Sequence, residues 1–203
     1  MDKIDLKKTL KHMYSPSAKE ISVIDVPRMN FLMIAGEGNP NTTQTYHEAV
    51  EALFAVSYAA KFMLKKETTA IDYTVMPLEG LWWADDMTLF SLENKDIWKW
   101  TAMIMQPEYV THEGFEEAKN QVVKKKDLPA LQRLRLESFR EGQSAQILYI
   151  GSYADEGPTI KAIHHFIETH GCTRNGKHHE IYLSDPNKTA PDKLKTIIRQ
   201  PFA

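Results

Sequence analysis

Hydrophobic and polar positions along the first half of the chain change period several times, and each period predicts a type of element. Apolar residues within 43–65 recur every three or four positions and predict a helix with one buried face, capped by the polar turn before it. Apolar runs rich in β-branched and aromatic residues predict strands at 21–26, 30–38, 71–83 and 97–107.

The second half repeats this alternation. Segment 109–126 is acidic early and Lys-rich late, which predicts a surface helix. We expect 131–142 and 144–153 to form a hairpin through a Glu141–Gly142 turn. A helix containing Ile160 and Ile167, ended by Gly171, and strands at 177–186 and 196–201 complete the pattern.

The order of these elements predicts an internal duplication. After an N-terminal arm at 1–19, two halves of a single domain (20–203), at about 20–107 and 128–203, each give strand, helix, strand and strand, with a helical segment between them. We therefore predict an α+β fold of tandem strand-helix-strand-strand (SHS2) modules. Its antiparallel sheet carries helices on one face and a ligand trough on the other.

Composition narrows the classes of function. The 203 residues carry a formal charge of −2, which gives no general attraction to nucleic acid. The single Cys172 cannot form an intrachain disulfide, and no apolar run approaches the roughly 20 residues of a membrane helix. We expect a cytoplasmic protein without nucleic-acid or membrane partners, and the pattern makes no prediction of oligomeric state.

One carboxylate stands out in strand 177–186. Because alternate side chains of a strand face opposite ways, Glu180 and Tyr182 share a face while Ile181 packs under the helices. Glu180 is therefore expected to point into the trough, where partial removal from water would raise its pKa and suit it to proton transfer. Glu79 holds the equivalent place in the first half and is expected to reach the same space. The competing interpretation is a solvated surface glutamate.

Large rings and a methionine are expected to surround this acid. Rings give a flat ligand broad contact and attract cations by about 0.5–2 kcal/mol. Of the adjacent Trp82 and Trp83, one is expected to face the trough, and we assign Trp83. The predicted ligand-binding residues are Glu79, Trp83, Trp100, Tyr153, Tyr182 and Met103.

Other chemistries are not favoured by the motifs. His178 and His179 are adjacent and so point apart on a strand, which argues against a metal site. The Gly-containing segment 36–41 has neither a third glycine nor a following Lys-Ser/Thr, which argues against a phosphate loop. We expect no metal and no cofactor.

Several stretches also resemble a known family, the GyrI-like small-molecule-binding proteins. They are DVPRMNFLMIAGEGNPN, SYAAKFMLKK, MPLEGLWW, TAMIMQPEYVT, DEGPTI and HHEIYLSDPNKTAPDKLKTIIRQP. Together they look like the stand-alone branch of that family. The resemblance implies that Glu180 matches the central pocket acid, which pairs with cationic drugs in sensor members fused to a DNA-binding domain. No helix-turn-helix is expected before residue 20.

The resemblance extends to function. Some stand-alone relatives are hydrolases that open the cyclopropane of DNA-alkylating natural products, which implies a role in detoxification. In such an enzyme Glu180 would be the acid-base residue, Tyr149 a hydrogen-bond donor and Trp100 a support for the flat substrate. Two alternatives stay open: a non-catalytic protein that binds and sequesters many cationic drugs, and a gyrase-inhibitor-like interaction protein.

Overall fold

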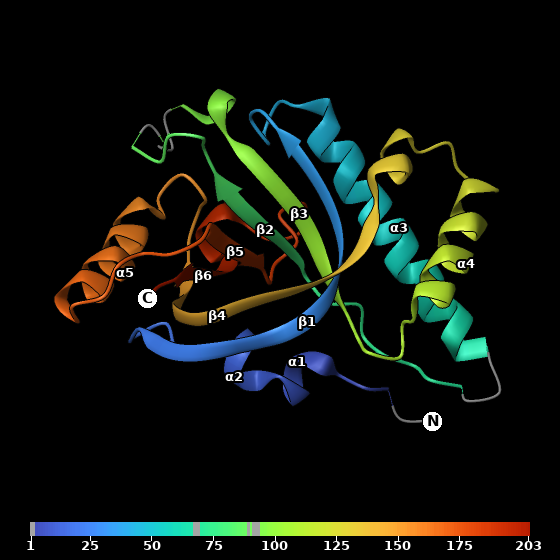
Figure 1. Ribbon diagram of the computed structural model, residues 1–203, viewed down its shortest axis with the longest axis horizontal. Helices are drawn as coiled ribbons and strands as arrows, with labels where there is room; N and C mark the ends of the chain where they lie inside the picture. The colour runs from blue at the N-terminus through green and yellow to red at the C-terminus, as the bar shows by residue number, and fades with distance from the viewer. Residues whose placement is uncertain (1–2, 67–69, 89, 91–93) are drawn as a thin grey trace.

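Six antiparallel strands form the centre of the molecule in the computed structural model, which describes residues 3–66, 70–88, 90 and 94–203. Hydrogen bonding runs in the order β1-β3-β2-β5-β6-β4 and closes from β4 back to β1 (Figure 1). The strands are β1 (Ser22–Glu37), β2 (Leu78–Trp83), β3 (Lys99–Gln106), β4 (Arg135–Ile150), β5 (His178–Tyr182) and β6 (Lys195–Pro201).

Helices surround this closed sheet. The α-helices are α1 (Leu6–Thr9), α2 (Lys11–Tyr14), α3 (Gln44–Lys66), α4 (His112–Val123) and α5 (Gly157–Thr169). Short 3-10 turns lie at η1 (Lys95–Ile97), η2 (Pro129–Arg133) and η3 (Pro191–Lys193). The prediction of an α+β fold with an antiparallel sheet is therefore confirmed. Among the described residues, none of these helices combines the length and apolarity needed to cross a bilayer.

The two longest strands correct part of the sequence analysis. The predicted runs at 21–26 and 30–38 form one strand, β1, and the predicted hairpin at Glu141–Gly142 is wrong. These two residues lie inside β4, which pairs with β1 in one register from Ser22 opposite Gln146 to Met33 opposite Arg135, interrupted at Pro27. Gly142 has φ +80°, a conformation that glycine adopts without strain, and it lies opposite Val26.

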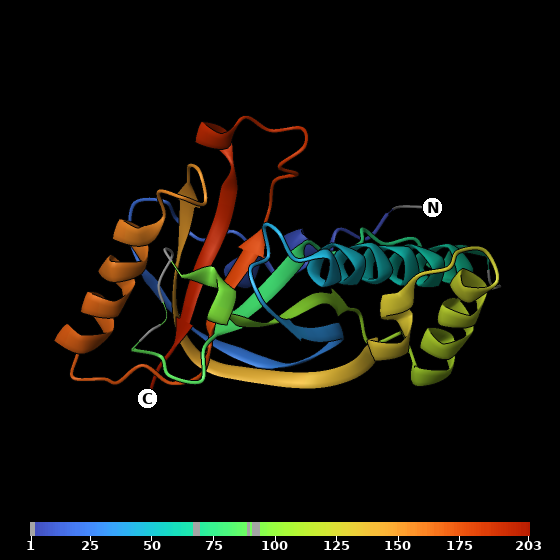
Figure 2. The ribbon, with the colours of Figure 1, turned by 90° about the horizontal axis from the view of Figure 1, so that it is seen from above.

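Both long helices pack on the same face of the sheet, here called the helix-bearing face. Ser57 of α3 accepts a hydrogen bond from Gln106 of β3 at 3.1 Å. Ile163 of α5 is buried with Ala145 and Ile198 from β4 and β6. The two helices lie toward opposite ends of the molecule, with β2 and β5 drawn between them (Figure 1). Helix α4 packs on α3 (Figure 2).

The N-terminal residues cover the opposite face, here called the arm face. Met13 and Tyr14 of α2 are almost fully buried, and the Tyr14 hydroxyl donates to Glu79 at 2.8 Å. The predicted arm is thus docked on the sheet. The two faces of β5 consequently differ: one lies on the side that carries α3, which packs on β1 and β3, and α5, which packs on β4 and β6, and the other lies on the side of the N-terminal arm.

Candidate functional site

Glu180 points to the helix-bearing face. Its Cα partners are Gly80 of β2 and Ile198 of β6, and Ile198 packs under α5. Paired residues of antiparallel strands share a face, so Glu180 lies on the side that carries α3 and α5. The expectation that Glu180 faces away from the helices, with Ile181 beneath them, is wrong. The alternation of side chains along a strand shows which residues share a face, but it does not show which other elements pack against that face.

Hydrogen bonds from neighbouring side chains hold Glu180 in place. The Tyr182 hydroxyl donates to its Oε2 at 2.6 Å, and His178 Nε2 lies 3.0 Å from its Oε1. Trp82 Nε1 donates in turn to the Tyr182 hydroxyl at 3.1 Å. Only 5% of Glu180 is exposed, so these partners replace water around the carboxylate.

A second carboxyl group, that of Glu156, completes what we call the Glu180 cluster: Trp82, Glu156, His178, Glu180 and Tyr182. Glu156 is 2% exposed at the N-terminal end of α5. Burial, followed by the charge of Glu180 and a hydrogen bond to it, raises the pKa of Glu156 to about 9. Glu156 is therefore protonated at neutral pH and donates to Glu180.

The pKa of Glu180 is lowered, whereas the sequence analysis predicts that burial raises it. Burial acts to raise its pKa, but hydrogen bonds from His178, Tyr182 and Glu156 outweigh burial and place the pKa below its usual value. The cluster thus holds a carboxylate beside a carboxylic acid. Within the described residues, Oε2 of Glu156 is buried without a hydrogen-bond partner.

Aromatic rings form the wall between α3 and the cluster. The ring of Tyr46, in the first turn of α3, lies 5.0 Å from Trp100 and 5.6 Å from Trp82. The ring of Tyr153 packs edge-on against Tyr182 at 5.7 Å. Burial and the charge of Glu180 raise the pKa of Tyr153 to about 12, so its hydroxyl stays a donor.

Two strand glycines make room for the indoles. A Cβ atom on Gly80 would lie 2.6 Å from Nε1 of Trp82, and one on Gly36 would lie 2.3 Å from Cζ2 of Trp100. Both indoles therefore lie flat against the backbone of the sheet, as glycine permits where another group approaches closely. A side chain at either position would push a tryptophan toward Tyr46.

The structure divides the predicted site residues between the two faces. Trp100, Tyr153 and Tyr182 lie with Glu180 on the helix-bearing face, as does Tyr149, whose hydroxyl donates to the Ser152 carbonyl at 3.0 Å. Three others do not join them. By strand register, the residues that face the opposite side are Glu79, Trp83 and Met103. The expectation that Glu79 reaches the same space as Glu180 is therefore wrong.

Glu79 belongs to a separate group on the arm face, here called the Arg199 network: Tyr14, Glu79, Glu141, Gln146, His179 and Arg199. His179 lies between two carboxylates, with Nε2 3.0 Å from Glu79 and Nδ1 2.9 Å from Glu141. Arg199 contacts Glu141 at 3.1 Å and donates to the backbone carbonyl of Met13 at 2.8 Å. The network ties the N-terminal arm to the sheet.

Charges in the Arg199 network are balanced by close partners. Burial opposes the charged form of His179, but the two carboxylates outweigh burial and raise its pKa to about 9. Burial opposes ionisation of Glu141 as well, and His179 and Arg199 nonetheless lower its pKa to about 2. Within the described residues, no group of three or more His, Cys, Asp and Glu side chains forms a potential metal site.

The sequence reasoning missed four residues of this region. Glu156 lies in the DEGPTI stretch, ahead of the predicted helix, and the sequence carries no signal that it meets Glu180. His178 is considered in the sequence analysis only as a metal ligand, although it lies on the same side of its strand as Glu180. Of the adjacent Trp82 and Trp83, the sequence analysis assigns Trp83 to the trough. Tyr46 precedes the apolar stripe of its helix, where a ring contact with the sheet is not visible from periodicity.

Comparisons with known proteins agree on the relationship. Residues 19–202 match the model of the GyrI-like small molecule binding domain. An uncharacterized conserved protein from Listeria innocua is 41% identical, with 99% of this chain and 100% of that chain covered and a TM-score of 0.91. A hydrolase from Listeria innocua is 40% identical, with both chains covered completely and a TM-score of 0.89. No curated protein matches the chain.

A more distant structure shares the fold only. The C-terminal domain of EcmrR is 7% identical, with 91% of this chain and 97% of that chain covered and a TM-score of 0.56. At this identity the likeness concerns the arrangement of strands and helices, and site residues are not transferred.

Proposed function

Because the chain belongs to the GyrI-like small-molecule-binding family, we propose that the Glu180 cluster is its ligand site and that it hydrolyses flat, aromatic electrophiles of the cyclopropyl dienone type. The observation that carries the proposal is the pair of carboxyl groups: an ionised Glu180 beside a protonated Glu156, with the ring of Tyr182 bonded to Glu180 through its hydroxyl and packed against Tyr153. Similarity to a protein described as a hydrolase, at 40% identity over the whole chain, supports it.

The two carboxyl groups suit the two proton transfers of such a hydrolysis. Glu156 donates its proton to the dienone oxygen, and Glu180 accepts a proton from the attacking water. A bond forms between the water oxygen and a cyclopropane carbon, a carbon–carbon bond of the ring breaks, and its electron pair enters the former dienone, which becomes a phenol. The product is substrate plus water, and a proton passed from Glu180 to Glu156 restores the site.

The aromatic residues have a positioning role in this proposal. Tyr46, Trp100 and Tyr153 lie on the side of the sheet where Glu180 lies and pack edge-on against neighbouring rings, and we propose that this aromatic group contacts the flat substrate. Tyr149 is proposed as a further donor from the family resemblance, and its present bond to the Ser152 carbonyl would have to break for that role. The positions of Glu79, Trp83 and Met103 on the arm face do not support contact with the same ligand.

One observation favours a second candidate, a non-catalytic protein that sequesters aromatic cations. Glu180 is ionised and lies among rings, the arrangement that attracts a cation. Against this candidate, its carboxylate already accepts bonds from His178, Tyr182 and Glu156, which a cation would have to displace. The gyrase-inhibitor alternative stays a prediction that an assay of DNA supercoiling by gyrase would test.

Turnover of a cyclopropyl dienone fused to an indole tests the proposal. We expect the purified protein to remove the dienone absorbance with multiple turnovers and to form the hydrated phenol. Glu180→Gln should lower kcat/KM by about 10²- to 10⁴-fold, the usual contribution of a general base. Glu168→Gln, which changes an exposed glutamate of α5, is the matched control and should keep full activity.

Two results would contradict the hydrolase. If Glu180→Gln turned over the substrate at the same rate and kept its circular dichroism spectrum, Glu180 would not be the general base. Saturable binding of both the dienone and a cationic dye without any turnover would instead establish the sequestering protein.

A further inference from the structure

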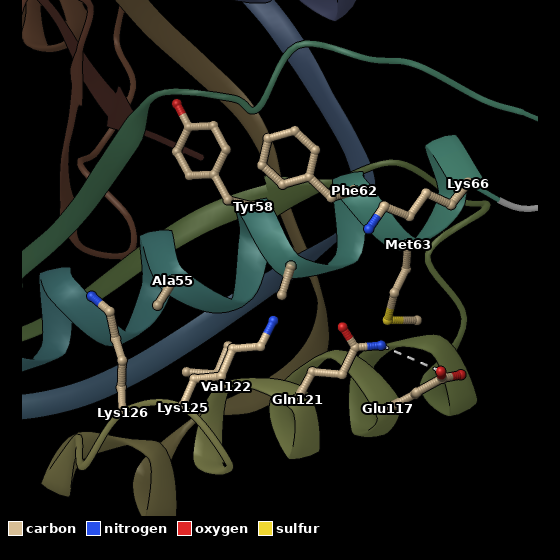
Figure 3. A pocket seen from close by; sticks show the side chains of 11 residues that line it. Ala55, Tyr58, Phe62, Met63, Lys66, Glu117, Gln121, Val122, Lys125 and Lys126 are labelled. Atoms are coloured by element: carbon tan, nitrogen blue, oxygen red, sulfur yellow. Dashed lines mark hydrogen bonds between the residues drawn. The ribbon is translucent and has the colours of Figure 1, made fainter.

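A groove lies between α3 and α4, away from the Glu180 cluster. The groove has a volume of about 660 Å³, within the range of small-molecule sites (Figure 3). Its lining comes from the outward side of α3 and from the C-terminal half of α4. None of the residues assigned to the Glu180 cluster contributes to it.

Small side chains and exposed rings shape the groove. Ala55 and Ala59 of α3 line it and leave space that larger residues would fill. Tyr58 and Phe62, on the same helix, are 45% and 52% exposed, and their rings stack at 6.2 Å. Figure 3 shows both rings rising from α3 on the side away from α4.

Two exposed rings on successive turns, Tyr58 and Phe62, stacked in line with the partly buried Phe54, are unusual for a surface helix. A surface helix normally turns charged and polar residues outward, yet Phe54, Tyr58 and Phe62 stack in succession along α3. Contiguous exposed apolar surface beside a hollow commonly marks a binding site. Tyr58 and Phe62 therefore extend the apolar surface at the α3 edge of the groove, on the side of α3 away from α4.

Charged residues around the groove are mostly basic. Three lysines and one glutamate line it: Lys66, Glu117, Lys125 and Lys126. Lys125 and Lys126 lie at the same end as Ala55, whereas Lys66 and Glu117 lie at the other end near Met63 (Figure 3). Lys126 is paired with Glu51 at 3.1 Å, and both partners are about half exposed. The end next to Ala55 is therefore the more positive one.

We propose that this groove binds an anionic amphiphile, such as a fatty-acid anion, at a site separate from the Glu180 cluster. The carboxylate lies at the Lys125 end, and the alkyl chain runs past Ala59 toward Met63. The distance along α3 from Ala55 to Lys66 is about 16 Å at the rise of an α-helix, which accommodates a medium-length chain. The charge preference is the opposite of that expected at Glu180, where the fixed charge is negative.

Fluorescence of the anionic probe anilinonaphthalene sulfonate, displaced by laurate, tests the site in the full chain. We expect saturable binding of the probe and competitive displacement by laurate, with dodecyltrimethylammonium displacing the probe at least tenfold less well. Lys125→Glu should weaken the binding of laurate by roughly three- to tenfold, as expected for reversing one exposed charge. Lys161→Glu, an exposed lysine on α5, is the control and should change little.

Two substitutions that change the shape of the groove provide a second, independent test. Ala59→Trp fills the groove and should abolish displacement by laurate. Phe62→Ala removes an exposed ring, so the variant should still fold. It should weaken the binding of laurate severalfold. Glu180→Gln should leave laurate binding unchanged, so failure of the hydrolase proposal and failure of this one are distinguishable.

Other outcomes would overturn the proposal. Equal displacement by dodecyltrimethylammonium would show that charge does not select the ligand. Loss of laurate binding in Glu180→Gln, but not in Phe62→Ala and Lys125→Glu, would assign the ligand to the Glu180 cluster. A dimer in sedimentation that Phe62→Ala dissociates, together with no laurate binding, would make the groove a contact between two copies of the chain.

Discussion

His179 and Glu180 are neighbours in β5, yet they belong to clusters on opposite faces of the sheet that differ in how their charges are compensated. On the arm face, the carboxylate of Glu141 has two cationic partners, His179 and Arg199. On the helix-bearing face, the carboxylate of Glu180 shares its space with a second carboxyl, that of Glu156. Glu141 and Glu180 are both buried, but only Glu180 lies beside a second carboxyl group, Glu156, whose pKa is raised by burial and by the charge of Glu180.

The difference separates a structural role from a chemical one. The Arg199 network pairs each charge and contacts the backbone of the N-terminal arm, so its expected effect is on stability. The Glu180 cluster leaves a buried oxygen of Glu156 without a partner among the described residues and raises the pKa of that group to about 9. Perturbed and incompletely satisfied carboxyl groups are typical of functional sites. Four predictions test this comparison.

The largest effect is expected from Arg199→Met. The change leaves Glu141 buried beside a single cation and removes the donor to the Met13 carbonyl. Breaking a buried ion pair typically lowers the free energy of unfolding by 3–5 kcal/mol. Urea denaturation measures this loss. Activity per folded molecule should change little.

Arg135→Met is the control for this measurement. Arg135 pairs with Glu137 at 2.8 Å, but both side chains are about half exposed, so the change should cost less than about 1 kcal/mol. Similar losses for the two variants would show that the buried network has no special role.

A fall in stability at alkaline pH is the next effect. The pKa of His179 is raised from 6.5 to about 9 in the folded protein, so its contribution is complete below pH 6.5 and is lost as the pH rises to about 9. The free energy of unfolding should fall by roughly 3 kcal/mol over this interval. Urea denaturation across the interval measures it.

Glu156 adds a change of the same sign because its folded pKa is also raised. Urea denaturation should therefore be repeated with Glu156→Gln, in which only the part of the pH-dependent change that is due to His179 should remain. A free energy of unfolding independent of pH in that variant would show that His179 does not bind its proton more tightly in the folded state.

Glu156→Gln should also change catalysis. Glutamine keeps a donor toward Glu180 but transfers no proton, so we expect kcat to fall by about 100-fold, the lower end for general acid catalysis. In the unaltered protein the rate should decline as the pH rises through about 9, where Glu156 loses its proton. This decline should be absent in the variant. If the variant keeps the decline, the proton comes from another group.

The smallest effects distinguish two tyrosines. Tyr182 donates to the charged Glu180 at 2.6 Å, whereas Tyr149 donates to a neutral carbonyl at 3.0 Å. Bonds to charged groups contribute more, so Tyr182→Phe should lower kcat/KM roughly tenfold and Tyr149→Phe only a few-fold. A larger loss in Tyr149→Phe would indicate that its hydroxyl turns to the substrate, as the family resemblance implies.

Strand β4 shows where sequence reasoning reached its limit. The alternating pattern of residues 131–142 correctly indicated a strand, but Glu141–Gly142 looked like a turn because that pair suits a hairpin. In the structure the same residues continue β4, since β1 pairs with both halves of β4 in one register, on either side of Pro27. Glu141 consequently turns its side chain to His179 and Arg199 instead of to solvent.

Local features could be predicted from the residues alone: the period of each segment, the α+β class, and the fact that Glu180 and Tyr182 share one side of their strand. These features follow from backbone geometry, which repeats every few residues. The folded chain was needed to show which elements lie on each side of β5, that Glu79 and Glu180 lie apart, and that Glu156 reaches Glu180. These depend on pairing between distant strands and on burial, which shift proton affinities through neighbours that no local pattern contains.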